Sequence, residues 1–217
     1  MAAPPVIAVV DYGAGNLRSV AKALARSGLE PEVTGDPAAV CRADGVVLPG
    51  VGAFADAVAS LRAKGLDRAL RESIAAGRPY LGLCLGIQVL FDESEEHGRN
   101  RGLGLLPGRV ERFSERDSSE RSLRVPHIGW NQVRFRGDHP MLARMPEADC
   151  YYFVHSYRVV PTDPEVAAGW ADYGGEFAAA VATESIFAVQ FHTEKSQSAG
   201  KRLLDAYAAW VASCRCA

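Results

Sequence analysis

The chain has 217 residues, of which 48% are hydrophobic and 23% charged, with a net charge of −2. Proteins that bind nucleic acid normally present a basic surface, so this balance argues against such a partner. No apolar stretch reaches the roughly 18 residues that a bilayer span needs, and residues 1–5 lack the features of a signal peptide. The sequence therefore predicts a single cytoplasmic domain over residues 1–217 that contacts neither nucleic acid nor membrane. We expect disorder at 1–5 and fraying at 212–217.

The five cysteines are odd in number and widely scattered, which does not fit a disulfide framework. We expect Cys41 and Cys150 to be small buried residues. Cys214 and Cys216 form a C-x-C motif without further ligands at the spacing of a zinc site. The sequence thus predicts no metal and no cofactor, and it leaves the role of the C-x-C motif open.

Strands and helices alternate in the first half of the sequence, which favours an α/β fold with a mostly parallel central sheet and flanking helices. Apolar runs predict strands at 6–10, 30–34, 45–48 and 80–83. Helical periodicity predicts helices at 15–26, 54–63 and 66–76. Sites in such sheets lie beyond the carboxyl ends of the strands.

The second half of the sequence is richer in strands, and we expect these to add antiparallel strands to the sheet. The predicted strands are 109–113, 132–136, 151–154, 166–170, 177–182 and 186–191. A closing helix is predicted from 196 to 211, with an apolar stripe along one side.

The segment 79–88 predicts a nucleophile elbow. An apolar run ends in Gly-Leu-Cys-Leu-Gly, and an apolar helical pattern follows it directly. Small residues two before and two after a nucleophile let the chain reverse sharply and hold the side chain beyond the sheet edge. A helix N-terminus also favours thiolate over thiol. Cys84 is therefore a candidate nucleophile, although an inert buried thiol would also fit this motif by itself.

A second apolar run, 186–191, leads directly into His192-Thr193-Glu194. Residues two apart in extended chain point to the same side, so His192 and Glu194 are predicted as a base and its orienting carboxylate, with Thr193 facing away. A surface ion pair would also explain them, and Glu194 suits the first turn of the last helix. Combined with the elbow, they predict a Cys84–His192–Glu194 triad.

Glycines flank Val51 in the loop that follows the strand predicted at 45–48. They either make a tight turn or free backbone N–H groups to bind an oxyanion. Beside an elbow cysteine we favour the second interpretation, with Val51 and Gly52 on this loop and the N–H of Leu85 as the other donor.

Two further motifs are ambiguous from the residues alone. The stretch 11–18 has Gly-x-Gly but lacks the third glycine of a dinucleotide fingerprint, so we exclude a nicotinamide site. It is either a helix entry or a polar surface presented to a partner. Trp130 stands among polar residues before a predicted strand, and it fits a core position or an interface anchor equally well.

These motifs together resemble those of the triad glutamine amidotransferases and, in more detail, of the glutaminase subunits of imidazole glycerol phosphate synthase. The resemblance extends from Val6 to about Trp210. Besides the elbow and the His-x-Glu motif it rests on four stretches, 11–20, 48–54, 126–131 and 152–157. It implies a single-domain, flavodoxin-like class I glutamine amidotransferase fold.

The resemblance also implies the chemistry of the site. Cys84 attacks the side-chain amide of glutamine, His192 carries the protons through a glutamyl thioester, and Glu194 holds the useful tautomer of His192. The glutamine pocket would comprise Gly50, Gln88, Glu96, His155, Ser156 and Tyr157. No cofactor is implied, and glutamate and ammonia are the products.

A partner is implied as well: a (β/α)8-barrel cyclase subunit that takes up the ammonia in histidine biosynthesis. It would form imidazole glycerol phosphate and an aminoimidazole carboxamide ribotide within a heterodimer. Asn16, Arg18, Trp130 and Lys195 would face this partner. The strand at 49–52 would rearrange so that the N–H of Val51 completes the oxyanion hole only when the partner is loaded.

The sequence departs from this family at two positions, and other functions stay open. Thr193 stands where the family usually has proline, and Arg158 where it commonly has tyrosine. The alternatives are a glutaminase that serves another synthase, a cysteine hydrolase or peptidase on the same scaffold, and a catalytically silent binding protein. The motif at 127–131 argues against the first, and an unbroken triad argues against the last.

Overall fold

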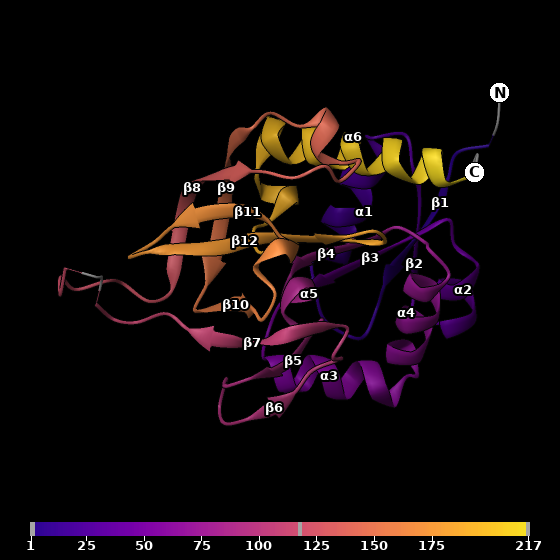
Figure 1. Ribbon diagram of the computed structural model, residues 1–217. Coiled ribbons are helices and arrows are strands. Elements are labelled where there is room, and N and C mark those ends of the chain that lie inside the picture. The colour runs from indigo at the N-terminus through magenta and orange to yellow at the C-terminus, as the bar shows by residue number, and fades with distance from the viewer. Residues whose placement is uncertain (1–2, 117–118, 216–217) are drawn as a thin grey trace.

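The computed structural model describes residues 3–116 and 119–215, and in this part of the chain thirteen strands form one continuous sheet with helices on both faces (Figure 1). The main path of the sheet runs β2-β1-β3-β4-β13-β12-β10-β7-β5-β6, and β11, β8 and β9 branch from β12. This order divides the sheet into a parallel part and an antiparallel extension.

The parallel part consists of five neighbouring strands that all run in one direction. They are β2 (Glu30–Thr34), β1 (Val6–Val10), β3 (Gly45–Gly50), β4 (Tyr80–Cys84) and β13 (Ile186–Val189). Helices cover both faces of these strands, and β3, β4 and β13 are buried throughout, which explains their unbroken apolar runs. Their carboxyl ends meet at one edge of the sheet, where an α/β protein places its site.

Two helices pack on one face of the parallel part and four on the other (Figure 1). The first face carries α1 (Leu17–Ala25) and α6 (Gln197–Cys214), and the second carries α2 (Pro37–Arg42), α3 (Phe54–Ala63), α4 (Leu66–Ala75) and the short α5 (Leu85–Gln88). The start of α2 is capped, because the Asp36 carboxylate accepts a hydrogen bond from the N–H of Ala38 at 3.0 Å.

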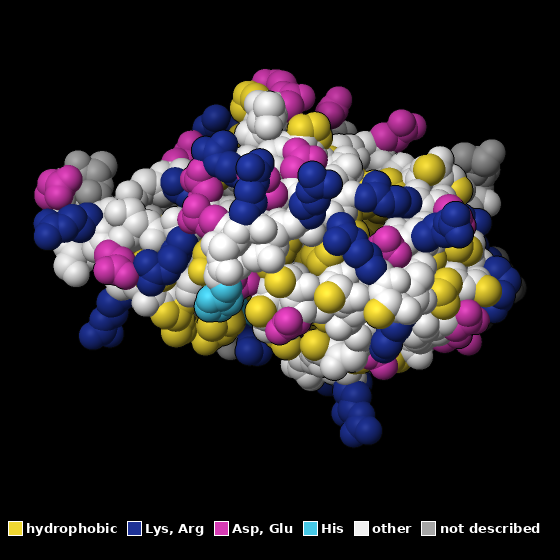
Figure 2. All heavy atoms as spheres, turned by 90° about the horizontal axis from the view of Figure 1, so that it is seen from below, with side chains coloured by type: hydrophobic (Ala, Val, Ile, Leu, Met, Phe, Trp, Pro, Cys, Tyr) yellow, Lys and Arg dark blue, Asp and Glu magenta, His cyan; other side chains and the backbone are white. Residues whose placement is uncertain are grey.

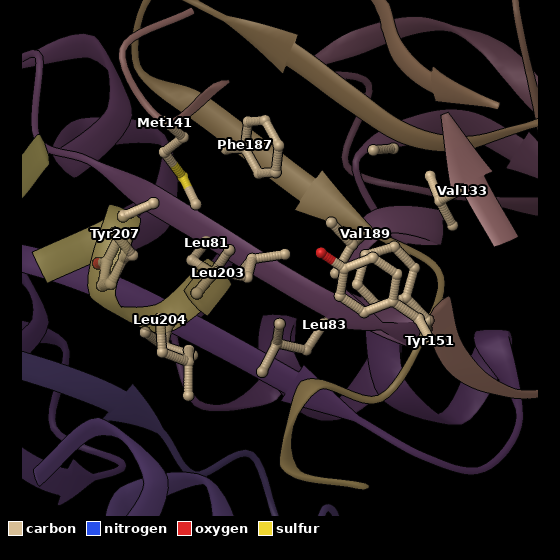
Figure 3. Packing of buried hydrophobic residues seen from close by; sticks show 14 of the residues in the cluster. Leu81, Leu83, Val133, Met141, Tyr151, Phe187, Val189, Leu203, Leu204 and Tyr207 are labelled. Carbon is tan, nitrogen blue, oxygen red and sulfur yellow. The ribbon is translucent and has the colours of Figure 1, made fainter. Parts of the chain in front are cut away.

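The core under α6 fixes the two strands that lead into the site (Figure 3). Among its members, Leu203, Leu204 and Tyr207 of α6 face Leu81 and Leu83 of β4 and Phe187 and Val189 of β13. The Tyr207 hydroxyl donates to the carbonyls of Val46 and Pro79, so its buried polar atom is satisfied. Close packing here leaves β4 and β13 little freedom to shift relative to each other.

The antiparallel extension continues the sheet beyond β13. Its strands are β12 (Glu176–Thr183), β10 (Tyr157–Pro161), β7 (Leu106–Arg112), β5 (Phe91–Ser94), β6 (Asn100–Arg101), β11 (Ala167–Asp172), β8 (His127–Phe135) and β9 (Ala148–His155). All neighbours in it pair antiparallel except β5 with β7. Three 3₁₀ turns complete the described elements: η1 (Leu142–Arg144), η2 (Pro164–Val166) and η3 (Thr193–Lys195).

The predicted elements agree best in the parallel part. The strands predicted at 6–10 and 30–34 and the helix predicted at 54–63 have the observed bounds. In the extension, β8 begins five residues before the predicted start at 132, and β5, β6 and β10 were not predicted. These strands are short or alternate with exposed polar residues, so they lack an apolar run.

Three other expectations need correction or fall outside the described chain. The closing helix continues to Cys214, past its predicted end at 211 and into the segment expected to fray. Cys150 is exposed on β9 and Cys41 is only partly buried, so neither is a fully buried thiol. Residues 1–2, 216 and 217 lie outside the described residues, whereas residues 3–5 carry no regular secondary structure.

Charged side chains of both signs are interspersed on the face seen from below (Figure 2). Lys and Arg lie scattered over this face, with Asp and Glu and small hydrophobic areas between them. Among the described helices, none combines the length and the apolarity that crossing a membrane requires.

Candidate active site

The nucleophile elbow is present at the carboxyl end of β4. Cys84 has φ 54° and ψ −107°, a conformation that costs free energy for a non-glycine residue. A Cβ on Gly82 would lie 2.7 Å from the carbonyl oxygen of Gly86, and a Cβ on Gly86 would collide with the carbonyl oxygen of Leu48. The Tyr80 hydroxyl donates to the Gly86 carbonyl at 2.8 Å. The turn therefore requires both glycines and holds Cys84 in one place.

The three predicted triad residues meet at this elbow. The Nδ1–H of His192 donates to the Glu194 carboxylate at 3.0 Å, which leaves Nε2 for its hydrogen bond to Cys84. Burial by itself lowers the pKa of His192, but the hydrogen bonds and charges of Cys84 and Glu194 outweigh it and raise that pKa to about 9. The same contact keeps the pKa of Glu194 below its usual value despite burial. The geometry favours an imidazolium beside a carboxylate.

The local conformation behind the His192–Glu194 pair differs from the extended chain that the sequence suggested. Strand β13 ends at Val189, and residues 193–195 form the 3₁₀ turn η3. The His192 N–H donates to the carbonyl of Tyr152 at 2.9 Å, and the Ser196 hydroxyl donates to the His192 carbonyl at 2.6 Å. Both bonds fix the turn, so the pair forms through it rather than through alternation along a strand.

A cavity of about 450 Å³ opens above Cys84 and His192. Besides these two it is lined by nine further residues that the sequence predicted: Val51, Gly52, Leu85, Gln88, Glu96, His155, Ser156, Tyr157 and Lys195. Pro126 and Val154 complete the lining. Glu194 lies behind His192 and lines a smaller hollow instead, together with Asn16 and Gly50.

The predicted oxyanion strand passes directly beside the nucleophile, since Gly50 is the register partner of Cys84 in the β3–β4 ladder. A Cβ on Gly50 would lie 2.7 Å from the Leu85 Cβ and 2.9 Å from the Tyr12 hydroxyl, so this close approach needs glycine. Gly52 has φ +97°, and Val51 between the two glycines is 43% exposed. The segment therefore lies beside the sulfur, but the backbone of Val51 contacts the Tyr12 hydroxyl, so its role in binding an oxyanion stays a prediction.

Glu96 enters the cavity from the turn between β5 and β6. Its carboxylate accepts the N–H of Phe54 at 2.5 Å, at the first residue of the ten-residue helix α3. Its carbonyl accepts a hydrogen bond from the Asn100 side chain at 2.7 Å. The hydrogen bond to the start of α3 fixes the carboxylate at the cavity, where it is placed to contact a substrate ammonium group.

His155, which lines the cavity, is hydrogen-bonded to His127, and the sequence did not predict this pair. The His155 Nδ1–H donates to the Tyr157 carbonyl at 2.8 Å, and the two rings meet with His127 Nδ1 2.9 Å from His155 Nε2. Burial lowers the pKa of His127 to about 4 and that of His155 to about 3. Both rings are therefore neutral at pH 7, and the Tyr157 carbonyl, which can only accept, fixes their tautomers.

Gln190 is the other functional candidate that the sequence did not indicate. Its side chain is fully buried, and its Nε2 lies 3.7 Å from the Cys84 sulfur. The available signal was a lone polar residue within the apolar run 186–191, at a position where a buried side chain must find partners.

Exposed aromatic and basic side chains lie at the predicted partner-facing positions. Trp130 is 50% exposed, so it is a surface residue rather than a core residue. Its ring meets that of Tyr152 edge-on with centroids 6.1 Å apart, and the Lys195 ammonium lies 5.7 Å from the Tyr152 centroid. Asn16 and Arg18, at the start of α1, are also exposed.

The two departures from the family pattern occupy different surroundings. The Arg158 guanidinium lies 5.6 Å from the Phe113 ring centroid and 3.9 Å from the Glu111 carboxylate, and Arg158 does not line the cavity. Thr193 is 3% exposed, and its hydroxyl has no hydrogen-bond partner among the described residues. No set of three or more His, Cys, Asp or Glu residues in 3–116 and 119–215 is arranged to hold a metal ion.

Fold and site together define a class I amidotransferase, and comparison with known proteins agrees. The family model described as glutamine amidotransferase class-I matches residues 8–207. Solved structures share the fold at low sequence identity. The structure of PurLQS from Thermotoga maritima matches with TM-score 0.73 at 19% identity, over 96% of this chain and 99% of the other. The glutaminase domain of CTPS from Trypanosoma brucei matches with TM-score 0.67 at 17% identity, over 96% and 94%.

Relatives of much higher identity narrow the family. The imidazole glycerol phosphate synthase subunit HisH of Syntrophotalea carbinolica is 48% identical over 92% of this chain and 97% of its own length. The protein of the same name from Moorella thermoacetica is 50% identical, over 91% of each chain. The chain belongs to this family of imidazole glycerol phosphate synthase subunits within the class I glutamine amidotransferases.

Proposed function

We propose that the chain hydrolyses glutamine to glutamate and ammonia at Cys84 and supplies the ammonia to a cyclase subunit in histidine biosynthesis. The observation that carries the proposal is the hydrogen-bonded Cys84–His192–Glu194 triad at the base of a cavity large enough for an amino acid. Family membership supports the same activity.

Glutamine would bind with its amino-acid end against the outer wall of the cavity. The carboxylate of Glu96 matches the substrate ammonium in charge, and the backbone at 155–157 offers polar groups to the substrate carboxylate. Gln88 lines the cavity between this wall and Cys84. The substrate amide then lies above the sulfur.

The triad geometry accounts for the proton movements. The raised pKa of His192, about 9, keeps its ring charged at neutral pH. The nucleophilic form of a cysteine is the thiolate, and the sulfur attacks in that form. Attack on the amide carbon forms a C–S bond and an oxyanion, for which the N–H groups of Leu85 and of the 50–52 strand are the proposed donors. His192 then gives its proton to the leaving nitrogen, and ammonia departs from a glutamyl thioester.

Water completes the cycle in a second step. Neutral His192 takes a proton from water, the hydroxide adds to the thioester carbon, and the C–S bond breaks to give glutamate and thiolate. Glu194 orients the ring and stabilises its charged form in both steps.

Membership of a synthase subunit family implies a partner cyclase subunit. We propose a heterodimer whose contact surface on this chain includes Asn16, Arg18, Trp130 and Lys195. All four side chains are exposed, and Lys195 also lines the cavity. Trp130 and Lys195 both contact the Tyr152 ring. The cytoplasm stays the predicted compartment.

The test is glutamate release from glutamine by the chain alone and by the chain mixed with the cyclase and its nucleotide ligand. We expect a low rate alone and strong activation in the mixture. Robust activity that is the same with and without the cyclase would support the triad chemistry and contradict the proposed partner. Absence of activity in both states would reject the glutaminase.

A further inference from the structure

The Cys84 sulfur has a second polar neighbour besides His192. Gln190 follows β13 directly, is 0% exposed, and places its Nε2 3.7 Å from the sulfur, within hydrogen-bond reach for sulfur. Its own backbone is fixed, since its N–H donates to the Ala179 carbonyl at 2.9 Å. A fully buried carboxamide costs free energy unless both its ends find partners.

The orientation of the Gln190 carboxamide follows from its neighbours. The Gln88 Nε2 donates to the Tyr157 carbonyl at 3.3 Å, and a carbonyl oxygen can only accept, so this end of Gln88 must be the amino group. The same Nε2 lies 3.0 Å from Gln190, whose facing atom must therefore be the acceptor Oε1. The other end of Gln190, which faces the sulfur, is consequently its NH₂ group.

The Tyr157 carbonyl accepts a hydrogen bond from a second side as well. It accepts the His155 Nδ1–H at 2.8 Å, and His155 is hydrogen-bonded to His127. A continuous chain of hydrogen bonds thus runs from the buried histidine pair through Gln88 and Gln190 to the sulfur. Every side chain in it has one orientation that satisfies its partners.

We propose that Gln190 is a positioning residue for Cys84, whose N–H holds the sulfur in its reactive rotamer and stabilises it as a thiolate. An N–H donor prefers a charged acceptor over a neutral one, so the contact strengthens when the thiol loses its proton to His192. The two residues have complementary roles: His192 receives the proton of the thiol, and Gln190 stabilises the negative charge that remains on the sulfur. The inference deepens the proposed glutaminase activity and rests on it for its catalytic consequence.

Two variants of Gln190 separate the effect of losing its N–H donor from the effect of changing its packing. Gln190→Met keeps the length of the side chain but removes the donor. Gln190→Glu keeps an acceptor for Gln88 and replaces the donor near the sulfur with a carboxylate oxygen. Gln132→Met, at an exposed glutamine on β8, is the matched control. Thermal melting of all three variants shows whether they remain folded.

The first readout does not depend on glutamine turnover. Iodoacetamide alkylates thiolates, and the peptide that carries Cys84 is followed by mass spectrometry across pH, apart from the other cysteines. We expect the pH midpoint of Cys84 alkylation to rise in Gln190→Met and further in Gln190→Glu, and the rate at pH 7 to fall about tenfold or more. The control should match the unmodified chain.

The second readout is steady-state glutaminase activity. We expect kcat to fall about ten- to a hundredfold in Gln190→Met, whereas KM for glutamine changes less than about threefold. Unchanged alkylation midpoints in two folded variants would overturn the proposal, as would a change confined to KM. If the unmodified chain fails to hydrolyse glutamine while the midpoints still shift, the proposed function fails and the role of Gln190 stands.

Discussion

The parallel part and the antiparallel extension of the sheet contribute different things to one site. Cys84 ends β4, the 50–52 segment begins at the last residue of β3, and His192 and Glu194 follow β13, so the reacting groups all lie at the carboxyl ends of parallel strands. The reacting groups thus lie in the parallel part, whereas the extension supplies the outer cavity wall and one predicted partner contact, the exposed Trp130. The other predicted partner contacts, Asn16, Arg18 and Lys195, follow parallel strands.

The largest expected effect is loss of the nucleophile. Cys84→Ala should lower glutamate formation by at least about a thousandfold, because no other group in the triad can form the thioester. Association with the cyclase should be unchanged, since Cys84 is 9% exposed at the base of the cavity. Glutamate release and a binding titration measure the two effects.

Cys41→Ala is the matched control for this variant, because Cys41 lies in α2, away from the cavity. It should keep full activity. Joint loss of folding in Cys84→Ala and Cys84→Ser would instead give Cys84 a chiefly structural role.

In the antiparallel extension we expect a variant that weakens association with the cyclase and leaves catalysis intact. Trp130→Ala should weaken binding of the cyclase by about thirtyfold, ~2 kcal/mol, as expected for a central aromatic anchor. Its effect on the melting temperature should be small, because the side chain is half exposed. At saturating cyclase the glutaminase rate should recover, and isothermal titration with turnover assays checks both points.

Val33→Ala is the control for that experiment. Val33 is 44% exposed on β2, at the opposite edge of the parallel part, so its truncation should leave cyclase affinity unchanged. Equal loss of cyclase affinity in Trp130→Ala and Val33→Ala would contradict the division between the two regions. A large drop in melting temperature for Trp130→Ala would indicate that Trp130 is a core residue.

The triad should also make stability depend on pH. The pKa of His192 is raised to about 9 in the folded chain, against an ordinary value of 6.5, so the folded state binds the proton more tightly. The resulting stabilisation is complete below pH 6.5 and is lost as pH rises toward and through 9. We expect the free energy of unfolding to fall by about 3 kcal/mol across this window.

Urea unfolding at several pH values measures this dependence. Cys84→Ala should flatten the curve, because the thiolate is one of the groups that raise the pKa of His192. An identical slope in the two proteins would show that Cys84 does not hold the proton on His192.

The smallest expected effect concerns the turn after His192. Thr193 is the first residue of η3, a position that favours proline, and His192 before it has φ −92° and ψ 104°, which a following proline accepts. Thr193→Pro should raise stability by about 0.5–1 kcal/mol and leave turnover nearly unchanged. Thr193→Val removes only the unpartnered hydroxyl, so in thermal melts it separates the effect of losing the hydroxyl from the effect of the proline ring on the backbone. Destabilisation by proline would contradict this account of the turn.

The contrast between the two regions also explains what the sequence could predict. Apolar runs such as 6–10 define buried parallel strands without ambiguity, and the elbow residues and the His-x-Glu pair are recognisable by type and spacing. By contrast β5 reads Phe-Asp-Glu-Ser and β6 has two residues, so neither carries a periodic signal.

The rest of the site depends on packing between distant segments. Gln88 meets Gln190 across 102 positions of sequence, and His127 meets His155 only because β8 pairs with β9. The residue types alone gave no indication that the members of either pair are in contact. The His192–Glu194 contact was predicted for a different conformation, since a 3₁₀ turn produces it here.

Covalent trapping of the nucleophile tests the central claim most directly. A glutamine analogue with an electrophilic diazoketone in place of its amide is added to the chain with its loaded cyclase, and the adduct is located by peptide mass spectrometry. The account predicts one adduct, on Cys84, that glutamine prevents and that Cys84→Ala abolishes. An adduct on another residue, or none while glutamate is still produced, would contradict a thioester mechanism at Cys84.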